Sequence, residues 1–462
     1  MQKKGRGHME KNLTTGSVFR NVLAFSLPYL LSYFLQTLYG MADLFIIGQF
    51  EGVASTTAVS IGSQVMHMLT VMIVGLAMGA TVSIAQAIGG NDRESAARSI
   101  GNTVTLFMAL SLGLMALLLA LRRPIVAVMS TPPEAVAGTV DYLTICFLGI
   151  PFITAYNILS SILRGMGDSK SPLYFIAVAC AANIGLDYLF MGALRMGPRG
   201  AALGTTLSQA VSVAVALLVI VRRKGGLAIS RGDFHPARAV MGKILKIGVP
   251  ITLQDGLIQV AFIVITIIAN RRGLNDAAAV GIVEKIISFL FLVPSSMLST
   301  VSALGAQNIG AGRPDRARQT LRYAVFIAAG FGALVVLLMQ FFAEPVVALF
   351  TDASQADGAS VIRLGGQYMR GYVWDCIFAG IHFSFSGYFC ACGRSGLSFL
   401  HNILAILLMR IPGVYWMSER FPDTLLPMGL ATSAGSLLSV LICAVAFALI
   451  SRRDASAPPE QA

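Results

Sequence analysis

Twelve long apolar segments run through this chain, and they constrain its fold more than any other feature. A helix of about 20 apolar residues crosses the hydrocarbon core of a bilayer, which is about 30 Å thick. All twelve segments reach that length, which leaves little of the 462 residues for a soluble domain. We expect the spans near 20–48, 53–89, 97–121, 136–163, 171–194, 200–222, 241–270, 277–310, 319–343, 362–391, 396–419 and 427–451. The sequence therefore predicts an all-α integral membrane protein with twelve transmembrane helices.

The Lys and Arg residues fall mainly on one side of these spans. Of the 34, the N-terminus, the even-numbered connections and the C-terminal tail hold 23, whereas the opposite loops hold 7. Because cytoplasmic loops are enriched in Lys and Arg, we expect both termini in the cytoplasm and a multi-pass protein of the cell (plasma or inner) membrane. This topology accounts for the net charge of +12, so we expect no nucleic-acid partner. We expect a monomer in the lipid bilayer.

The chain contains an internal repeat. The stretch 57–98 aligns with 278–318. The aligned pairs include Gln86 with Gln307 and Gly89 with Gly310. Each copy holds six spans, an even number, so both copies have the same orientation in the bilayer. We therefore predict two pseudo-symmetric six-helix bundles, an N-lobe and a C-lobe, around a central cleft.

The lobe boundaries follow from the basic connection after the sixth span. We place the N-terminal lobe at 1–225, a cytoplasmic linker at 226–242, and the C-terminal lobe at 243–462, ending in a short disordered tail. The positive-inside rule alone explains the charge of the linker, so we interpret it as a solvated loop.

Two acidic residues lie within the predicted N-lobe spans. Asn183 and Asp187 are four residues apart, so they share one face of the fifth span, about 6 Å from each other. Asp43 lies in the first span. A carboxylate in the bilayer core costs at least about 2.5 to 3.5 kcal/mol, so such residues are functional candidates. Two carboxylates in a low-dielectric site cannot both stay ionised without a proton or cation, which predicts an H⁺ or Na⁺ site. The alternative is an aspartate that only accepts hydrogen bonds from a neighbouring helix.

Other intramembrane side chains are candidates for a substrate cleft. Aromatic faces bind organic cations, and methionine adapts to varied shapes, although ordinary helix packing is the alternative for most of them. Buried charges are normally paired, so we expect Asp375, Arg370 and Arg410 to form a charge network in the C-lobe. The candidate cleft residues are Tyr39, Gln36, Glu284, Asp375, Met66 and Phe289.

Four motifs, in order along the chain, resemble the multidrug and toxic compound extrusion (MATE) family. They are LQTLYGMADLFIIG (35–48), AQAIGGND (85–92), LRGMGDSKSP (163–172) and GAALGTTLSQ (200–209). The resemblance extends over essentially the whole chain, including the spans and the repeat. It implies a V-shaped cleft between two bundles, and export of amphipathic, usually cationic compounds driven by inward flow of H⁺ or Na⁺.

The resemblance also implies a set of site residues. Members of the family with an N-lobe cation site build it from an Asp on the first helix, an Asn and an Asp on the fifth, and polar residues on the fourth and sixth. The residues at those places here are Asp43, Asn183, Asp187, Tyr142 and Thr205, with possible Na⁺ binding at the first three.

The C-lobe departs from the family pattern. Ala379 stands where other members carry a carboxylate, and the nearest acid is Asp375, one turn earlier. The C-lobe counterpart of the fifth span has Asn402, but the apolar Ile406 four residues later. We therefore expect the N-lobe alone to couple transport to an ion.

Three other function classes have less support. A flippase for a lipid-linked oligosaccharide, from the same wider superfamily, would require a strongly basic cavity, and few cations lie within the spans. The chain has no HExxH, GxSxG or GxxxxGK[ST] motif, which argues against an enzyme and against an ATP-driven pump. We expect no catalytic residues and no cofactor, with H⁺ or Na⁺ as the coupling ion.

Overall fold

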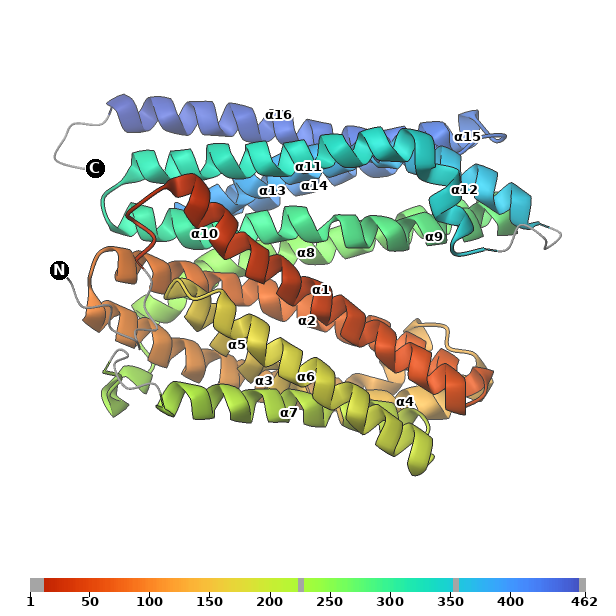
Figure 1. Ribbon diagram of the computed structural model, residues 1–462, viewed down its shortest axis with the longest axis horizontal. Coiled ribbons are helices and arrows are strands. Elements are labelled where there is room, and N and C mark those ends of the chain that lie inside the picture. The colour runs from red at the N-terminus through yellow and green to blue at the C-terminus, as the bar shows by residue number, and fades with distance from the viewer. Residues whose placement is uncertain (1–11, 223–227, 352–356, 457–462) are drawn as a thin grey trace. The chain divides into compact units, whose positions relative to one another are not determined.

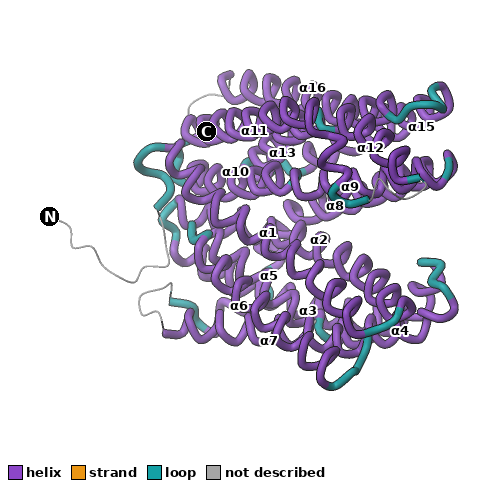
Figure 2. Tube along the Cα trace, turned by 45° about the vertical axis from the view of Figure 1, so that its right-hand side comes forward, coloured by secondary structure: helices purple, strands orange, loops and turns teal. Residues whose placement is uncertain are grey.

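The structure, a computed structural model, describes residues 12–222, 228–351 and 357–456. These residues form helices joined by short connections, and no strand occurs among them (Figures 1 and 2). The end of the predicted disordered tail, at 457–462, lies outside the described residues.

The helices follow one another along the chain, and two of the short elements, η1 and η3, are π-helical. In order, the elements are α1 (Val18–Phe50), α2 (Val53–Gly89), α3 (Arg93–Val128), α4 (Pro133–Leu148), α5 (Ile150–Gly165), α6 (Lys170–Asp187), η1 (Tyr188–Ala193), α7 (Pro198–Arg222), η2 (Arg231–Phe234), α8 (Arg238–Arg272), α9 (Leu274–Leu290), α10 (Leu292–Gly310), α11 (Pro314–Ala348), α12 (Gly358–Tyr372), α13 (Asp375–Ala391), α14 (Gly396–Ala405), η3 (Ile406–Arg410), α15 (Ile411–Arg420) and α16 (Leu426–Ser456).

Each predicted span coincides with one helix or with a broken helix. Ten helical segments of the described chain are long and apolar enough to cross a membrane, and the bent pair of α4 and α5 makes an eleventh. The remaining predicted span corresponds to α12 and α13, which have only 15 and 17 residues and are separated at Val373 and Trp374. The all-helical membrane fold predicted from the sequence is confirmed.

The bend between α4 and α5 has a local cause. The two helices meet at Gly149 with an angle of 48°. Pro151 follows in the first turn of α5, where its missing N–H removes one hydrogen bond to the preceding turn.

The chain divides into two compact units. Unit 1 comprises Met1–Thr252 and Ala306–Arg313, and unit 2 comprises Leu253–Gly305 and Pro314–Ala462. The described part of the predicted linker, 228–242, therefore belongs to unit 1.

The described part of the linker is largely exposed, as expected for a solvated loop, and it also makes hydrogen bonds to α3. The Asn102 side chain donates to the carbonyl of Asp233 at 3.0 Å and accepts from the amide of Ala237 at 2.8 Å. Thr105 Oγ1 donates to the carbonyl of Phe234 at 2.8 Å. Gly101 lets the two backbones approach, because a Cβ there would overlap the carbonyl of Asp233. The charge pattern could not reveal this docking, because hydrogen bonds to linker carbonyls depend on backbone geometry.

A second close backbone contact in unit 1 joins the ends of α2 and α10. A Cβ on Gly89 would overlap the carbonyl oxygen of Gln307, and a Cβ on Gly310 would overlap the carbonyl oxygen of Gln86. We call these four residues the glycine seam. They are the pairs that the sequence repeat aligns, so the contact is reciprocal.

The Gln307 side chain ties the glycine seam to its surroundings. Its Nε2 donates to the carbonyl of Gly165 at 3.1 Å, and its Oε1 accepts from the amide of Leu13 at 3.2 Å. Both bonds are buried, so they hold the start of the described chain and the end of α5 against the seam.

Candidate cation site

Two apolar helices of unit 1 bring the N-lobe acids together. Asp43 on α1 is 2% exposed, and Asn183 and Asp187 on α6 are 0% exposed. After Asp187 the chain continues as the π-helix η1, a local irregularity that is frequent at functional sites. All three residues are therefore buried within unit 1.

Helix α7 supplies the hydroxyl that the resemblance assigned to this site. Thr205 Oγ1 donates to Asp43 Oδ2 at 2.9 Å. Tyr39 lies one turn before Asp43 on α1, and its Oη donates to the carbonyl of Thr205 at 3.2 Å. The same Oη lies 3.3 Å from Ser208 Oγ. Tyr39, expected in the substrate cleft, thus belongs to the wall of the acidic site.

The acidic site contains several buried polar atoms that have no hydrogen-bond partner among the described residues. Asp43, Asp187 and Asn183 are neighbours, close enough for each side chain to affect the charge of the others. Among the described residues, however, Asp43 Oδ1, both carboxylate oxygens of Asp187 and both polar atoms of Asn183 have no hydrogen-bond partner. Buried polar atoms are nearly always paired, so this cluster fits a proton or a small cation that completes it.

A glycine makes room for the Asp187 carboxylate. A Cβ at Gly204 on α7 would overlap Asp187 Oδ1, and it would lie 3.6 Å from Asn183 Nδ2. Gly204 directly precedes Thr205, so one turn of α7 provides both the hydroxyl and the space.

Tyr142 lies in packed surroundings beside this cluster. It is 1% exposed, and its Oη is 3.0 Å from Ser63 Oγ on α2. Its ring fills the space next to Gly62. Its one hydrogen bond in the described chain therefore goes to α2 and not to the carboxylates.

The other cleft candidates of unit 1 have different environments. Gln36 is half-buried on α1, two turns before Asp43. Met66 is 7% exposed and packs in the hydrophobic core that also contains Tyr142. Met66 is therefore an ordinary core residue that takes part in helix packing.

The unit 2 candidates lie on α9 and α13. Thr266 Oγ1 donates to Glu284 Oε2 at 3.2 Å, whereas Glu284 Oε1 is buried without a partner in the described chain. Phe289 is half-buried near the end of α9. Asp375 accepts from Arg410 Nη2 at 2.8 Å, and both side chains are buried.

The predicted C-lobe charge network is only partly present. Asp375 and Arg410 form a buried pair, but Arg370 belongs to another pair and contacts Glu344 at 3.0 Å. Arg370 Nε also donates to the carbonyl of Gln340 at 3.3 Å. Arg370 lies five residues before Asp375, and two interhelical residues separate α12 from α13 at this point, so its side chain turns to α11 instead.

The family model MatE matches residues 28–189 and 250–416, which is most of the chain and both halves of the repeat. The chain belongs to the MatE family, the MATE transporters.

Curated relatives and solved structures of MATE transporters resemble the chain over nearly its full length. A probable multidrug resistance protein, YpnP of Bacillus subtilis, is 28% identical and covers 87% of this chain and 88% of its own. An FAD transporter of Shewanella oneidensis is 25% identical, and the aligned region covers 91% of this chain and 94% of the transporter. The structure of a multidrug resistance MATE family transporter in an outward-facing conformation has a TM-score of 0.87 at 22% identity. The superposition covers 98% of this chain and 100% of that one.

Sequence reasoning missed one residue of the MATE acidic site. Gly204 bears no functional group, and a glycine in a helix of small residues has several ordinary explanations. The signal that could have pointed to it is its position directly before Thr205 in a motif shared with the family. The partner across the helix interface became visible only with the structure.

Proposed function

We propose that this MATE transporter is a secondary active antiporter that exports amphipathic organic cations in exchange for H⁺ or Na⁺. The observation that carries the proposal is the pair of neighbouring buried carboxylates, Asp43 and Asp187. Three of their four oxygens accept no hydrogen bond from the described residues.

The chemistry of the cluster suits a coupling ion. Carboxylate oxygens, the Asn183 amide oxygen and the Thr205 hydroxyl are hard oxygen ligands of the kind that coordinate Na⁺, and the carboxylate pair can hold a proton. An ion couples to export only if it binds one arrangement of the protein more tightly than the other. Neutralisation of the Asp43 and Asp187 pair provides such a difference in binding free energy.

The substrate, the location and the energy source follow from the family and the charge pattern. YpnP is named for multidrug resistance, which supports small drug-like substrates, and the aromatic and acidic side chains suit cations. The positive-inside pattern supports the cell membrane, with both termini cytoplasmic. The protein acts as a monomer and as a transporter, not an enzyme, and an ion gradient supplies its energy.

Reconstituted transport tests the proposal. Wild-type protein, Asp43→Asn and Asp187→Asn are placed in proteoliposomes, and export of tetraphenylphosphonium is measured with a pH gradient or a Na⁺ gradient imposed alone. We expect wild-type export with one of the gradients and loss of gradient-driven export in both variants.

Asp141→Asn is the matched control. It makes the same chemical change in unit 1, but Asp141 is at the surface, where it pairs with Arg199 at 2.9 Å. This variant should transport like the wild type. Full activity of both Asp43→Asn and Asp187→Asn would contradict the proposal.

A further inference from the structure

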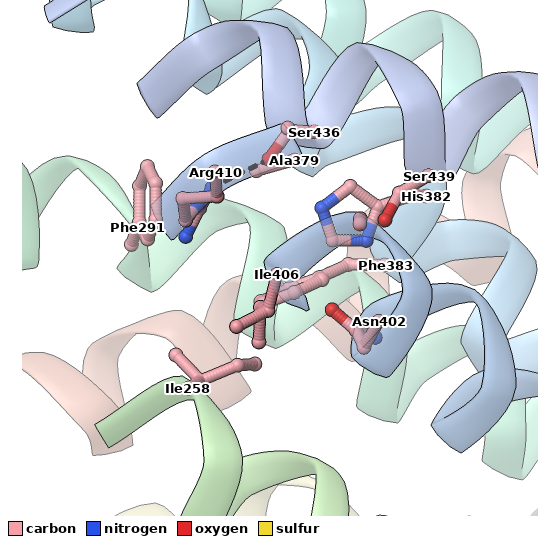
Figure 3. Close-up of a pocket in the computed structure, with 12 residues that line it drawn as sticks. Ile258, Phe291, Ala379, His382, Phe383, Asn402, Ile406, Arg410, Ser436 and Ser439 are labelled. Atoms are coloured by element: carbon pink, nitrogen blue, oxygen red, sulfur yellow. Dashed lines mark hydrogen bonds between the residues drawn. The ribbon is translucent and has the colours of Figure 1, made fainter. Parts of the chain in front are cut away.

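Basic side chains outside the acidic site have two kinds of surroundings. In unit 2, Arg410 Nη2 donates to Asp375 Oδ2 at 2.8 Å and to Ser436 Oγ at 2.7 Å. Figure 3 shows Arg410 and Ser436 in the wall of a cavity that has room for about one water molecule. The charge of this arginine is therefore neutralised inside the protein. In unit 1, by contrast, several arginines and lysines lie exposed around η2 and the start of α8.

The segment from 228 to 246 combines exposed basic residues with exposed apolar ones. Ile229 and Phe234 are 42% and 41% exposed. One exposed apolar side chain is ordinary, but apolar side chains among several basic ones are typical of segments that lie at a membrane surface. The basic residues, all exposed, are Arg231, Arg238, Lys243 and Lys246.

The one acidic residue of this segment closes the turn of η2. Asp233 Oδ2 accepts from the amide of Ser230 at 2.7 Å and from its hydroxyl at 2.8 Å. These hydrogen bonds hold the pKa of Asp233 below its usual range. The aspartate therefore stays ionised, and the four basic residues still leave the segment with a surplus of positive charge.

Helix α3 fixes the place of η2. Thr105 Oγ1 donates to the carbonyl of Phe234 at 2.8 Å. The Asn102 side chain donates to the carbonyl of Asp233 at 3.0 Å and accepts from the amide of Ala237 at 2.8 Å. The backbone is thus held at Phe234 and on both sides of it.

This contact lies at the edge of the hydrocarbon core. On α3, the charged residues Arg98 and Arg122 bound the uncharged stretch 99–121. At 1.5 Å per residue this stretch is about 34 Å long, close to the thickness of the core, about 30 Å. Asn102 and Thr105 lie in its first two turns. Helix α3 therefore holds η2 where the hydrocarbon gives way to the lipid headgroups.

We propose that η2 and the start of α8 form a binding site for the phosphate of an anionic phospholipid. Arg231 and Arg238 bind the headgroup, because a guanidinium matches phosphate oxygens and basic residues at a membrane surface attract anionic lipids. Ile229 and Phe234 lie against the upper part of the acyl chains. The positive-inside pattern assigns this side to the cytoplasm, whose leaflet carries anionic lipid. The site goes beyond the proposed function, since it involves neither the coupling ion nor the exported compound.

A tryptophan at the site can report which lipid lies beside it. The two native tryptophans are removed from the full-length chain by Trp374→Phe and Trp416→Phe, and Phe234→Trp keeps an aromatic ring at the site. The protein is placed in bilayers of equal parts phosphatidylglycerol and phosphatidylcholine, with brominated acyl chains on one lipid or on the other. Fluorescence quenching should show phosphatidylglycerol favoured about fivefold or more, the effect expected of one basic residue at the surface.

Two double variants on this background separate the site from the general charge of its side. Arg231→Gln/Arg238→Gln should reduce the preference for phosphatidylglycerol to within about twofold, while the tryptophan remains in contact with lipid. Arg20→Gln/Arg322→Gln is the matched control, because it removes the same charge from exposed positions that the charge pattern places on the same side. The control should keep the full preference.

Three results would overturn the lipid site. If neither lipid quenches the fluorescence, position 234 faces water. If both lipids quench equally in the parent protein, the contact is apolar and the headgroup is not recognised. If the control loses as much preference as Arg231→Gln/Arg238→Gln, only the general positive charge of this side attracts the lipid. The bilayers carry no ion gradient, so a failure of antiport would leave these measurements unchanged.

Discussion

The two halves of the chain place opposite charges about one helical turn apart in corresponding spans. In unit 1, α6 ends at Asp187 and continues as the π-helix η1, and in unit 2, α14 continues as the π-helix η3, which ends at Arg410. The repeat aligns Asp187 with Ile406, so the irregular backbone is shared and the acid is not. Asp187 has no donor in the described chain, whereas Arg410 has a resident counter-ion in Asp375. The acid of unit 1 therefore has no counter-ion among the described residues, whereas the arginine of unit 2 has one.

Removal of one partner from the buried pair should have the largest effect. Arg410→Met leaves Asp375 charged and buried, and we expect it to lower the free energy of unfolding by about 3 to 5 kcal/mol. Thermal unfolding in detergent measures the loss. The double variant Arg410→Met/Asp375→Leu removes both charges and should be close to the wild type in stability. A double variant as unstable as the single one would show that unit 2 does not depend on internal neutralisation.

At the glycine seam, in contrast, the two copies of the repeat make matching contacts, so matching substitutions should have equal effects. Gly89→Ala and Gly310→Ala each push a Cβ into a backbone carbonyl that cannot move aside, and each should cost about 3 kcal/mol, the upper end for overpacking. Gly40→Ala on α1, where a Cβ meets nothing within 4 Å, is the control. If the two seam variants lose different amounts of unfolding free energy in the same assay, the two contacts are not equivalent.

Gly204→Ala should disturb coupling more than stability. Its new Cβ displaces the Asp187 carboxylate, a side chain that can move, so we expect a stability loss of about 1 to 2 kcal/mol together with impaired gradient-driven export. Gly185→Ala is the matched control on α6, because nothing lies within 4 Å of its Cβ. Export by Gly204→Ala at the wild-type rate would contradict the role of this glycine in the acidic site.

Much of this arrangement could be predicted from the sequence, and the reasons differ from part to part. The spans were predictable because bilayer thickness fixes the length of an apolar helix, and Asp43, Asn183 and Asp187 stood out because charge in such a helix is costly. The docking of the linker on Asn102 was not predictable, because it depends on carbonyls, which every residue has. The pairing of Asp375 with Arg410 rather than Arg370 depends on the break between α12 and α13, which leaves no clear mark in the sequence.

A surface ion pair should give the smallest effect. Asp141 and Arg199 are 2.9 Å apart, like the buried pair, but their side chains are 38% and 63% exposed. Solvent screening limits such pairs, so Asp141→Asn should change the free energy of unfolding by at most about 1 kcal/mol. A loss comparable to that of Arg410→Met would mean that burial does not explain the difference between the two pairs.

The glycine seam also has a symmetry of its own. Gly89 meets Gln307 while Gly310 meets Gln86, so residue i of one copy touches residue j of the other, and j touches i. This is the pattern of an isologous contact in a twofold-symmetric homodimer. The two aligned segments of one chain thus meet here through the kind of contact that identical subunits make.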